Sequence, residues 1–183
     1  QYFPGWRIIK LKQKIAIISP VPSMIESVIE SSMIRKAVDN GILDIHIVNP
    51  RDFSKGSYQQ IDDTPFGGGS GMLLKPDVLG KSIDSNIKKN EKIFYLSPKG
   101  KKFDQKIAKE LSKEKTINLI CGHFEGVDER ILGTRNIEEI SIGDYILSGG
   151  ESASFVVIDS VLRLLPNVLG NNMSKKDESF ENG

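Results

Sequence analysis

Short runs of apolar, mostly β-branched residues alternate with helix-like segments along most of the chain. We predict strands from these runs at residues 14–19, 42–48, 92–96, 116–121 and 137–142. The spacing of apolar residues predicts helices at 23–40, 76–86, 103–114, 128–132 and 151–165. Strands that alternate with helices form parallel sheets, because each helix carries the chain back to the start of the next strand. The pattern therefore predicts an α/β fold, a mostly parallel sheet with helices on both faces.

The segment 51–71 fits neither pattern. It is long, polar and glycine-rich, and it ends in the run 67–71, so we predict a functional loop there. This run is not a dinucleotide-binding fingerprint, which directly follows the first strand and opens a helix. Here the first strand is followed by Pro20 and Pro22 without a glycine. That difference argues against a nucleotide-cofactor oxidoreductase with an unknotted parallel sheet.

Composition narrows the class of protein. The chain has 183 residues, enough for one domain with a sizeable core and the start of a second. Its 25 Lys and Arg nearly balance its 24 Asp and Glu, so overall charge does not predict a nucleic-acid partner. With Cys121 as the single cysteine, an intrachain disulfide is impossible and a reducing, cytoplasmic setting is expected. No apolar run approaches the roughly 20 residues of a membrane helix, so no membrane partner is predicted.

Glycines gather in the loops that follow the later strands, at 97–100, where we predict a turn, at 122–126 and at 143–150. In parallel sheets, ligands collect at the carboxyl ends of the strands. Glycines there let the backbone approach a ligand closely or take a positive φ. The alternative is that these glycines only end strands and cap helices. Three such loops in one chain favour a shared ligand site.

Several segments closely resemble the tRNA (guanine-N1)-methyltransferase family, a branch of the SPOUT methyltransferases. They are PRDF at 50–53, DDTPFGGGSGM at 62–72, YLSP at 95–98, CGHFEGVDER at 121–130, SIGDYILSGGE at 141–151, IDSV at 158–161 with Arg163, and VLG at 168–170. The resemblance runs in register from about residue 14 to 183. His123 stands where arginine is common in the family, and Ser70 replaces a usual proline.

The resemblance implies more than the residue pattern does. It implies a SPOUT-type deep trefoil knot within a methyltransferase domain at 14–170, and an obligate homodimer with its two sites at the subunit interface. Residues 171–183 would begin an interdomain linker, with the family's C-terminal tRNA-binding domain absent. Residues 1–13 are interpreted as an appended remnant or an unusual extension.

S-adenosylmethionine is the cofactor that the resemblance implies, held in a bent shape by the knotted loops. The implied binding residues are Tyr95, Leu96, Ser97, Pro98, Gly122, Glu125, Ile142, Gly143, Asp144, Tyr145, Ile146, Leu147, Gly149 and Gly150. Magnesium is a further implied cofactor, with Glu125 as its supporting carboxylate. Alternatively, Glu125 is a loop carboxylate satisfied by nearby backbone N–H groups.

The implied reaction is methyl transfer to N1 of the guanine beside the anticodon in tRNA. A base must remove the N1 proton, and a fixed donor must stabilise the charge that develops on O6. The family pattern gives Arg163 for O6, and Glu178 or its neighbour Asp177 for the base. The alternatives are a surface arginine and two solvated linker carboxylates. A second functional hypothesis is a truncated module that binds the cofactor and dimerises without methylating tRNA.

Overall fold

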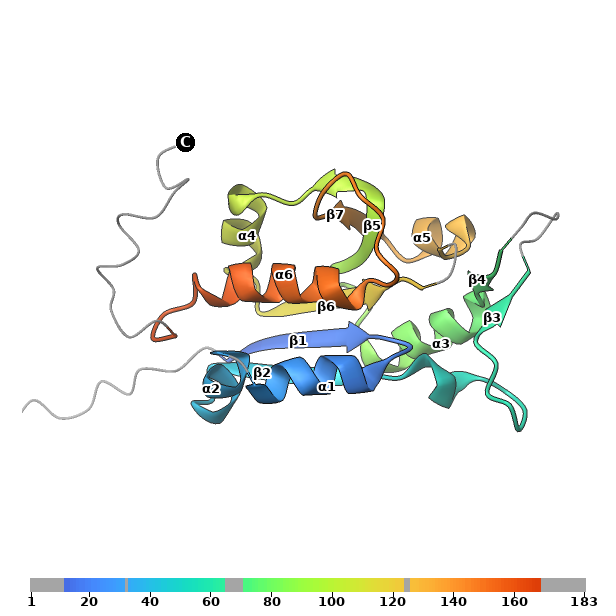
Figure 1. Ribbon diagram of the computed structural model, residues 1–183, viewed down its shortest axis with the longest axis horizontal. Coiled ribbons are helices and arrows are strands. Elements are labelled where there is room, and N and C mark those ends of the chain that lie inside the picture. Colours follow the sequence, from blue (N-terminus) through green and yellow to red (C-terminus); the bar gives the residue numbers. More distant parts are fainter. Residues whose placement is uncertain (1–11, 32, 65–70, 124–125, 169–183) are drawn as a thin grey trace, which may run out of the picture.

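Five parallel strands form the central sheet of the protein. The computed structural model describes residues 12–31, 33–64, 71–123 and 126–168 (Figure 1). The strands lie in the order β2-β1-β6-β5-β7, and every neighbouring pair is parallel. Their bounds are β1 (Gln13–Ile18), β2 (Leu43–Val48), β5 (Ile93–Lys102), β6 (Thr116–Cys121) and β7 (Ile137–Ser141). The predicted α/β class and its mostly parallel sheet are confirmed.

Helices cover both faces of this sheet. They are α1 (Pro22–Ser31), α2 (Met33–Asp39), α3 (Pro76–Asn86), α4 (Gln105–Leu111), α5 (Glu129–Thr134) and α6 (Glu151–Leu162). Ile15 and Ile17 of β1 share an apolar cluster with α1, α2, α4 and α6, while Ile18 belongs to the cluster of α3 and α5. This alternation follows the two-residue period of a strand. Figure 1 shows that α6 and α1 lie on the same face of the sheet.

Strand β5 continues through the residues predicted as a turn at 97–100. Leu96 and Lys101 both pair with Ile140 of β7, so the intervening residues bulge out of the ladder. Gly100 lies against the β7 backbone, where a Cβ would stand 2.5 Å from the carbonyl carbon of Glu139. The prediction of a turn was wrong because the chain bulges here and then resumes its pairing, without reversing direction.

Two other predicted segments also differ in detail. The helix predicted at 23–40 is described as α1 and α2, on either side of residue 32, which lies outside the described residues. The predicted loop at 51–71 begins after the first residue of a 3-10 turn, η1 (Pro50–Phe53), and contains strand β3 (Asp62–Asp63). β3 pairs antiparallel with β4 (Leu73–Leu74). Residues 65–70, which include most of the glycine run, lie outside the described residues.

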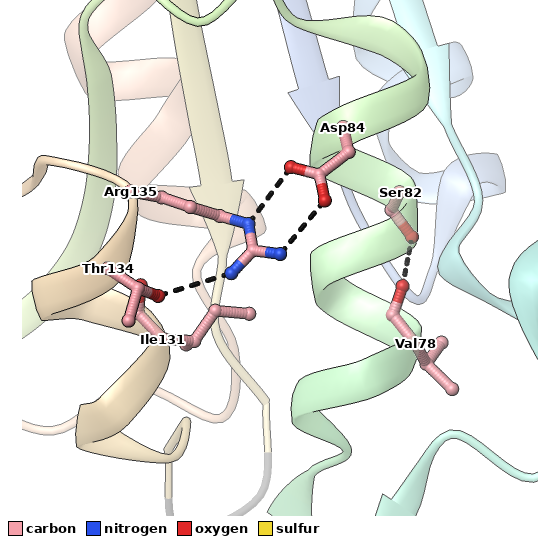
Figure 2. Close-up of polar contacts among 6 residues, drawn as sticks. All are labelled: Val78, Ser82, Asp84, Ile131, Thr134 and Arg135. Carbon is pink, nitrogen blue, oxygen red and sulfur yellow. Dashed lines mark hydrogen bonds and ion pairs between the residues drawn. The ribbon is translucent and has the colours of Figure 1, made fainter.

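An ion pair joins α3 to the end of α5, the two helices that share the second apolar cluster. Arg135, directly after α5, donates from Nε and Nη2 to the two carboxylate oxygens of Asp84 on α3, at 3.0 and 2.9 Å (Figure 2). The same guanidinium donates to Thr134 at 3.2 Å. This two-pronged contact lowers the pKa of Asp84 below its ordinary value, because hydrogen bonds to the carboxylate favour its charged form. Within the described residues, no helix has the length and apolar character needed to cross a membrane.

Candidate functional site

A cavity of about 530 Å³ lies at the carboxyl ends of β5, β6 and β7. Its wall comes from the β5 bulge, the loop after β6, and the connection from β7 to α6. The predicted cofactor residues in this wall are Tyr95, Leu96, Ser97, Pro98, Gly122, Ile142, Gly143, Tyr145, Ile146, Leu147, Gly149 and Gly150. The β5 bulge and the two glycine-containing loops thus meet at one cavity, as their positions at the carboxyl ends of parallel strands predict.

Two of the glycines are required by close packing of these loops. A Cβ at Gly122 would stand 2.6 Å from the hydroxyl oxygen of Tyr95, and a Cβ at Gly150 would stand 2.7 Å from Cα of Cys121. The backbone N–H of Gly150 donates to the carbonyl of Gly122 at 2.8 Å. The start of α6 therefore rests directly on the end of β6. The alternative interpretation, that the glycines only end strands and cap helices, does not account for the close packing at these two positions.

The connection 142–150 carries large apolar side chains that face outward. Ile146 is 83% exposed, and Tyr145 and Leu147 are also exposed, although all three line the cavity. The Ser141 hydroxyl fixes the start of this connection: it donates to the carbonyl of Gly143 at 3.0 Å and accepts from the Gly143 N–H at 3.2 Å. The connection is thus anchored at its beginning, and it presents apolar surface beside the cavity.

Two buried titratable groups, Tyr95 in the cavity wall and Cys121 behind it, are neutral near pH 7. Burial, with a smaller effect of the Glu139 carboxylate, raises the pKa of Tyr95 to about 12. Burial also raises the pKa of Cys121, and the nearby Glu151 carboxylate acts in the same direction. Tyr95 therefore offers the cavity a phenol that can donate a hydrogen bond, and Cys121 is a buried thiol rather than a nucleophile.

Sequence reasoning missed a buried acidic residue next to the cavity. Glu151, the first residue of α6, is 1% exposed. It accepts a hydrogen bond from the Ser19 hydroxyl at 2.6 Å, and its other oxygen lies 2.7 Å from Nε2 of His123 in the cavity wall. The signal in the sequence was an acidic residue directly after two glycines, at the start of an otherwise apolar helix.

Two further predicted site residues, Asp144 and Arg163, are not part of the wall of this cavity. Asp144 is exposed on the 142–150 connection and is not part of the wall. Arg163 is exposed at the C-cap of α6, about ten residues beyond Ala153, which lines the cavity. At a rise of about 1.5 Å per residue, it lies roughly 15 Å further along the helix. Glu125, Asp177 and Glu178 lie outside the described residues.

The described residues contain no group of three His, Cys, Asp or Glu side chains that could hold a metal ion. Glu125, the residue predicted to support magnesium, lies outside the described residues. The role of magnesium therefore stays a prediction.

Comparison with known proteins identifies relatives of the whole described fold. The family model described as "tRNA (Guanine-1)-methyltransferase TrmD" matches residues 13–183. A tRNA (guanine-N(1)-)-methyltransferase of Pelagibacter ubique (strain HTCC1062) is 65% identical over 162 residues, which cover 88% of this chain and 71% of the relative. The enzyme of the same name from Carboxydothermus hydrogenoformans is 47% identical, over 91% of this chain and 66% of the relative.

The family match spans every segment that lines the cavity. A match to a family model over nearly the whole chain cannot result from the similarity of one loop alone. With 65% identity to a relative over most of its length, the chain belongs to the tRNA (guanine-N1)-methyltransferase family.

Proposed function

We propose that this protein transfers a methyl group from S-adenosylmethionine to N1 of the guanine beside the anticodon in tRNA. The observation that carries the proposal is the cavity shared by the β5 bulge and the two glycine-containing loops. The names of the relatives support the reaction, since both are tRNA (guanine-N(1)-)-methyltransferases. The family predicted from the sequence is confirmed.

The cavity fits a nucleoside-sized ligand. Its volume of about 530 Å³ lies within the range of small-molecule sites, about 300–1,000 Å³. Leu96, Ile142 and Leu147 line it, and we assign the edge of the adenine to their main-chain groups, as the family resemblance implies. The absence of a Cβ at Gly122 and Gly150 lets the loops pack without filling the cavity. When bound, S-adenosylmethionine would supply an electrophilic methyl group on a sulfonium.

The guanine requires groups beyond this cavity. Its N1 proton must leave as the new bond forms, and charge then builds on O6. We assign the base to Glu178, or to its neighbour Asp177, and the O6 donor to Arg163. Arg163 lies at the far end of α6 from the cavity of its own chain, so we assign it to the cavity of a second copy.

A homodimer would meet this requirement. The exposed apolar side chains of Tyr145, Ile146 and Leu147 beside the cavity, and Val156 on α6, support an interface there. In such a dimer, one protomer would hold the methyl donor and its partner would supply the arginine. The trefoil knot stays a prediction from the family, as do the domain boundaries, and a tRNA substrate would place the reaction in the cytoplasm.

The direct test is methylation of two tRNA transcripts that differ only in the base beside the anticodon, guanine or adenine. We expect transfer to the guanine transcript alone, with the methyl group mapped to N1. Donor binding without transfer to either transcript would refute the proposed reaction. It would support the second hypothesis, a module that binds the donor and dimerises without methylating tRNA. Glu178→Gln and Asp177→Asn, compared in the same assay, would identify the base as the variant with the larger loss of kcat.

Mixed dimers test the role of Arg163. We expect Arg163→Ala to lower kcat at least about 10²-fold while donor binding is retained. Mixing this variant with a donor-binding-deficient one should restore about a quarter of the wild-type activity, since half of the randomly formed dimers would hold one intact site. If the mixture stays inactive although both variants are dimeric, Arg163 does not act across the interface.

A further inference from the structure

One buried carboxylate links three elements around the cavity. Glu151 begins α6, Ser19 directly follows β1, and His123 lies in the loop after β6. Oε1 of Glu151 accepts from the Ser19 hydroxyl at 2.6 Å, and Oε2 is paired with Nε2 of His123 at 2.7 Å. A carboxylate only accepts hydrogen bonds, so Nε2 of His123 is the donor. We call these three residues the Glu151 network.

The network is tightly fixed on the side away from the cavity. Ser19 is fully buried, and its hydroxyl also accepts from the N–H of Val21 at 3.0 Å. A buried carboxylate is costly unless it is hydrogen-bonded, so each lost partner leaves an acceptor oxygen that water cannot reach. The position of Glu151 therefore depends on both Ser19 and His123.

On its other side the network touches the cavity wall. The backbone of Gly149 lies directly against it: a Cβ there would stand 2.5 Å from Oε2 of Glu151 and would also collide with Nε2 of His123. Gly149 and His123 both line the cavity, whereas Ser19 and Glu151 do not. A shift of the carboxylate would thus move two parts of the wall together.

We propose that the Glu151 network is a positioning device that sets the affinity of the cavity for the methyl donor, acting through His123 and the backbone of Gly149. The inference rests on the proposed function. Ser19 and Glu151 are positioning residues in this scheme, because neither reaches the cavity itself.

A purely structural role makes a different prediction. An acidic residue in the first turn stabilises a helix through the helix dipole. In that case, weakening the network would lower the stability of the protein without changing its affinity for the donor. Two buried serines separate these roles, because both hydroxyls donate to Glu151 but to different atoms. Ser19 binds its carboxylate, and Ser154 binds its main-chain carbonyl at 2.6 Å.

The experiment compares Ser19→Ala with Ser154→Ala, both fully buried serines in the wild type. Calorimetry with S-adenosylhomocysteine measures donor-site affinity, and urea denaturation measures stability. We expect about tenfold weaker binding for Ser19→Ala, the scale of one hydrogen bond to a charged group, and less than about twofold for Ser154→Ala. Equal affinities for the two variants would overturn the inference.

A second pair of variants tests His123. His123→Gln keeps an N–H donor at about the place of Nε2, whereas His123→Leu removes it. We expect His123→Leu to raise KM for S-adenosylmethionine about tenfold with a smaller change in kcat, and His123→Gln to restore most of the affinity. Unchanged KM in His123→Leu would overturn the inference. Wild-type protein that binds no S-adenosylhomocysteine would refute the proposed function and this inference together, whereas wild-type binding with unchanged binding by Ser19→Ala would refute the inference alone.

Discussion

Gly150 offers the sharpest test of how the cavity is built. Its φ of −76° and ψ of −8° lie in the helical region, which alanine also adopts freely. The effect of Gly150→Ala is therefore steric. The added methyl would stand 2.7 Å from Cα of Cys121 and 2.8 Å from the backbone nitrogen of Gly122. Carbon atoms in contact normally stay about 3.5–4 Å apart, so the start of α6 or the end of β6 must move by roughly 1 Å.

The magnitude follows from that displacement. Overpacking of this kind costs about 1–3 kcal/mol, and we expect Gly150→Ala to lose that much free energy of unfolding. The same movement stretches the hydrogen bond from Gly150 to Gly122, which joins two loops of the cavity wall. A misplacement of about 1 Å in a preorganised site can cost roughly 10²-fold, so we expect S-adenosylhomocysteine to bind at least about tenfold more weakly.

Urea denaturation and calorimetry measure these two quantities. The matched control is Gly133→Ala, because Gly133 lies within α5 and a Cβ there meets nothing within 4 Å. Alanine in a helix is more stable than glycine by about 0.5–1 kcal/mol, so the control should gain stability and keep its affinity. If Gly150→Ala matches the wild type in both measurements, the close packing of the start of α6 on β6 is refuted.

Two further predictions concern charged groups that do not line the cavity. Hydrogen bonds from Arg130 lower the pKa of Asp128 from 3.8 to about 2, so its stabilising effect is complete above about pH 4 and declines toward pH 2. Asp128→Asn keeps the cap of α5 without the charge. Its free energy of unfolding, measured by urea denaturation, should fall below that of the wild type by an amount that shrinks as the pH falls from about 5 to 3. A difference from the wild type that does not change with pH would contradict this prediction. Asp84→Asn should cost no more than about 1 kcal/mol, because the Asp84 side chain is 63% exposed and its pair with Arg135 is screened. Thermal unfolding should show this loss fading in high salt, and a loss above about 2 kcal/mol would disprove the screening argument.

Local patterns were sufficient to predict the order of the five strands of the central sheet and of the helices between them, although not the two-residue strands β3 and β4. Helix α3 has the predicted bounds, 76–86, because its apolar spacing and the proline at its first position act within the segment itself. The β5 bulge was not predictable in the same way. Its form depends on the pairing of Leu96 and Lys101 with the same residue of β7, about forty positions later in the chain. No pattern within 97–100 contains that information.

The same distinction between local and long-range information applies to the candidate site. The cavity loops could be predicted, because loops after parallel strands meet at one edge of the sheet. The Glu151 network could not, because it joins Ser19 to a residue 132 positions later. Seen in the sequence alone, Glu151 is an acidic residue at a helix start, where such residues are common on the surface. The position of Arg163 relative to the cavity required the length and direction of α6.

The bond between Ser19 and Glu151 also constrains when the protein becomes functional during its synthesis. Glu151, whose carboxylate Ser19 binds, emerges from the ribosome 132 residues after Ser19. The nascent chain can pair its first two strands long before that point, but the wall of the cavity stays incomplete until α6 has been made. Contacts so distant in sequence are slow to close, so the ability to hold a ligand is acquired only after α6 has been made.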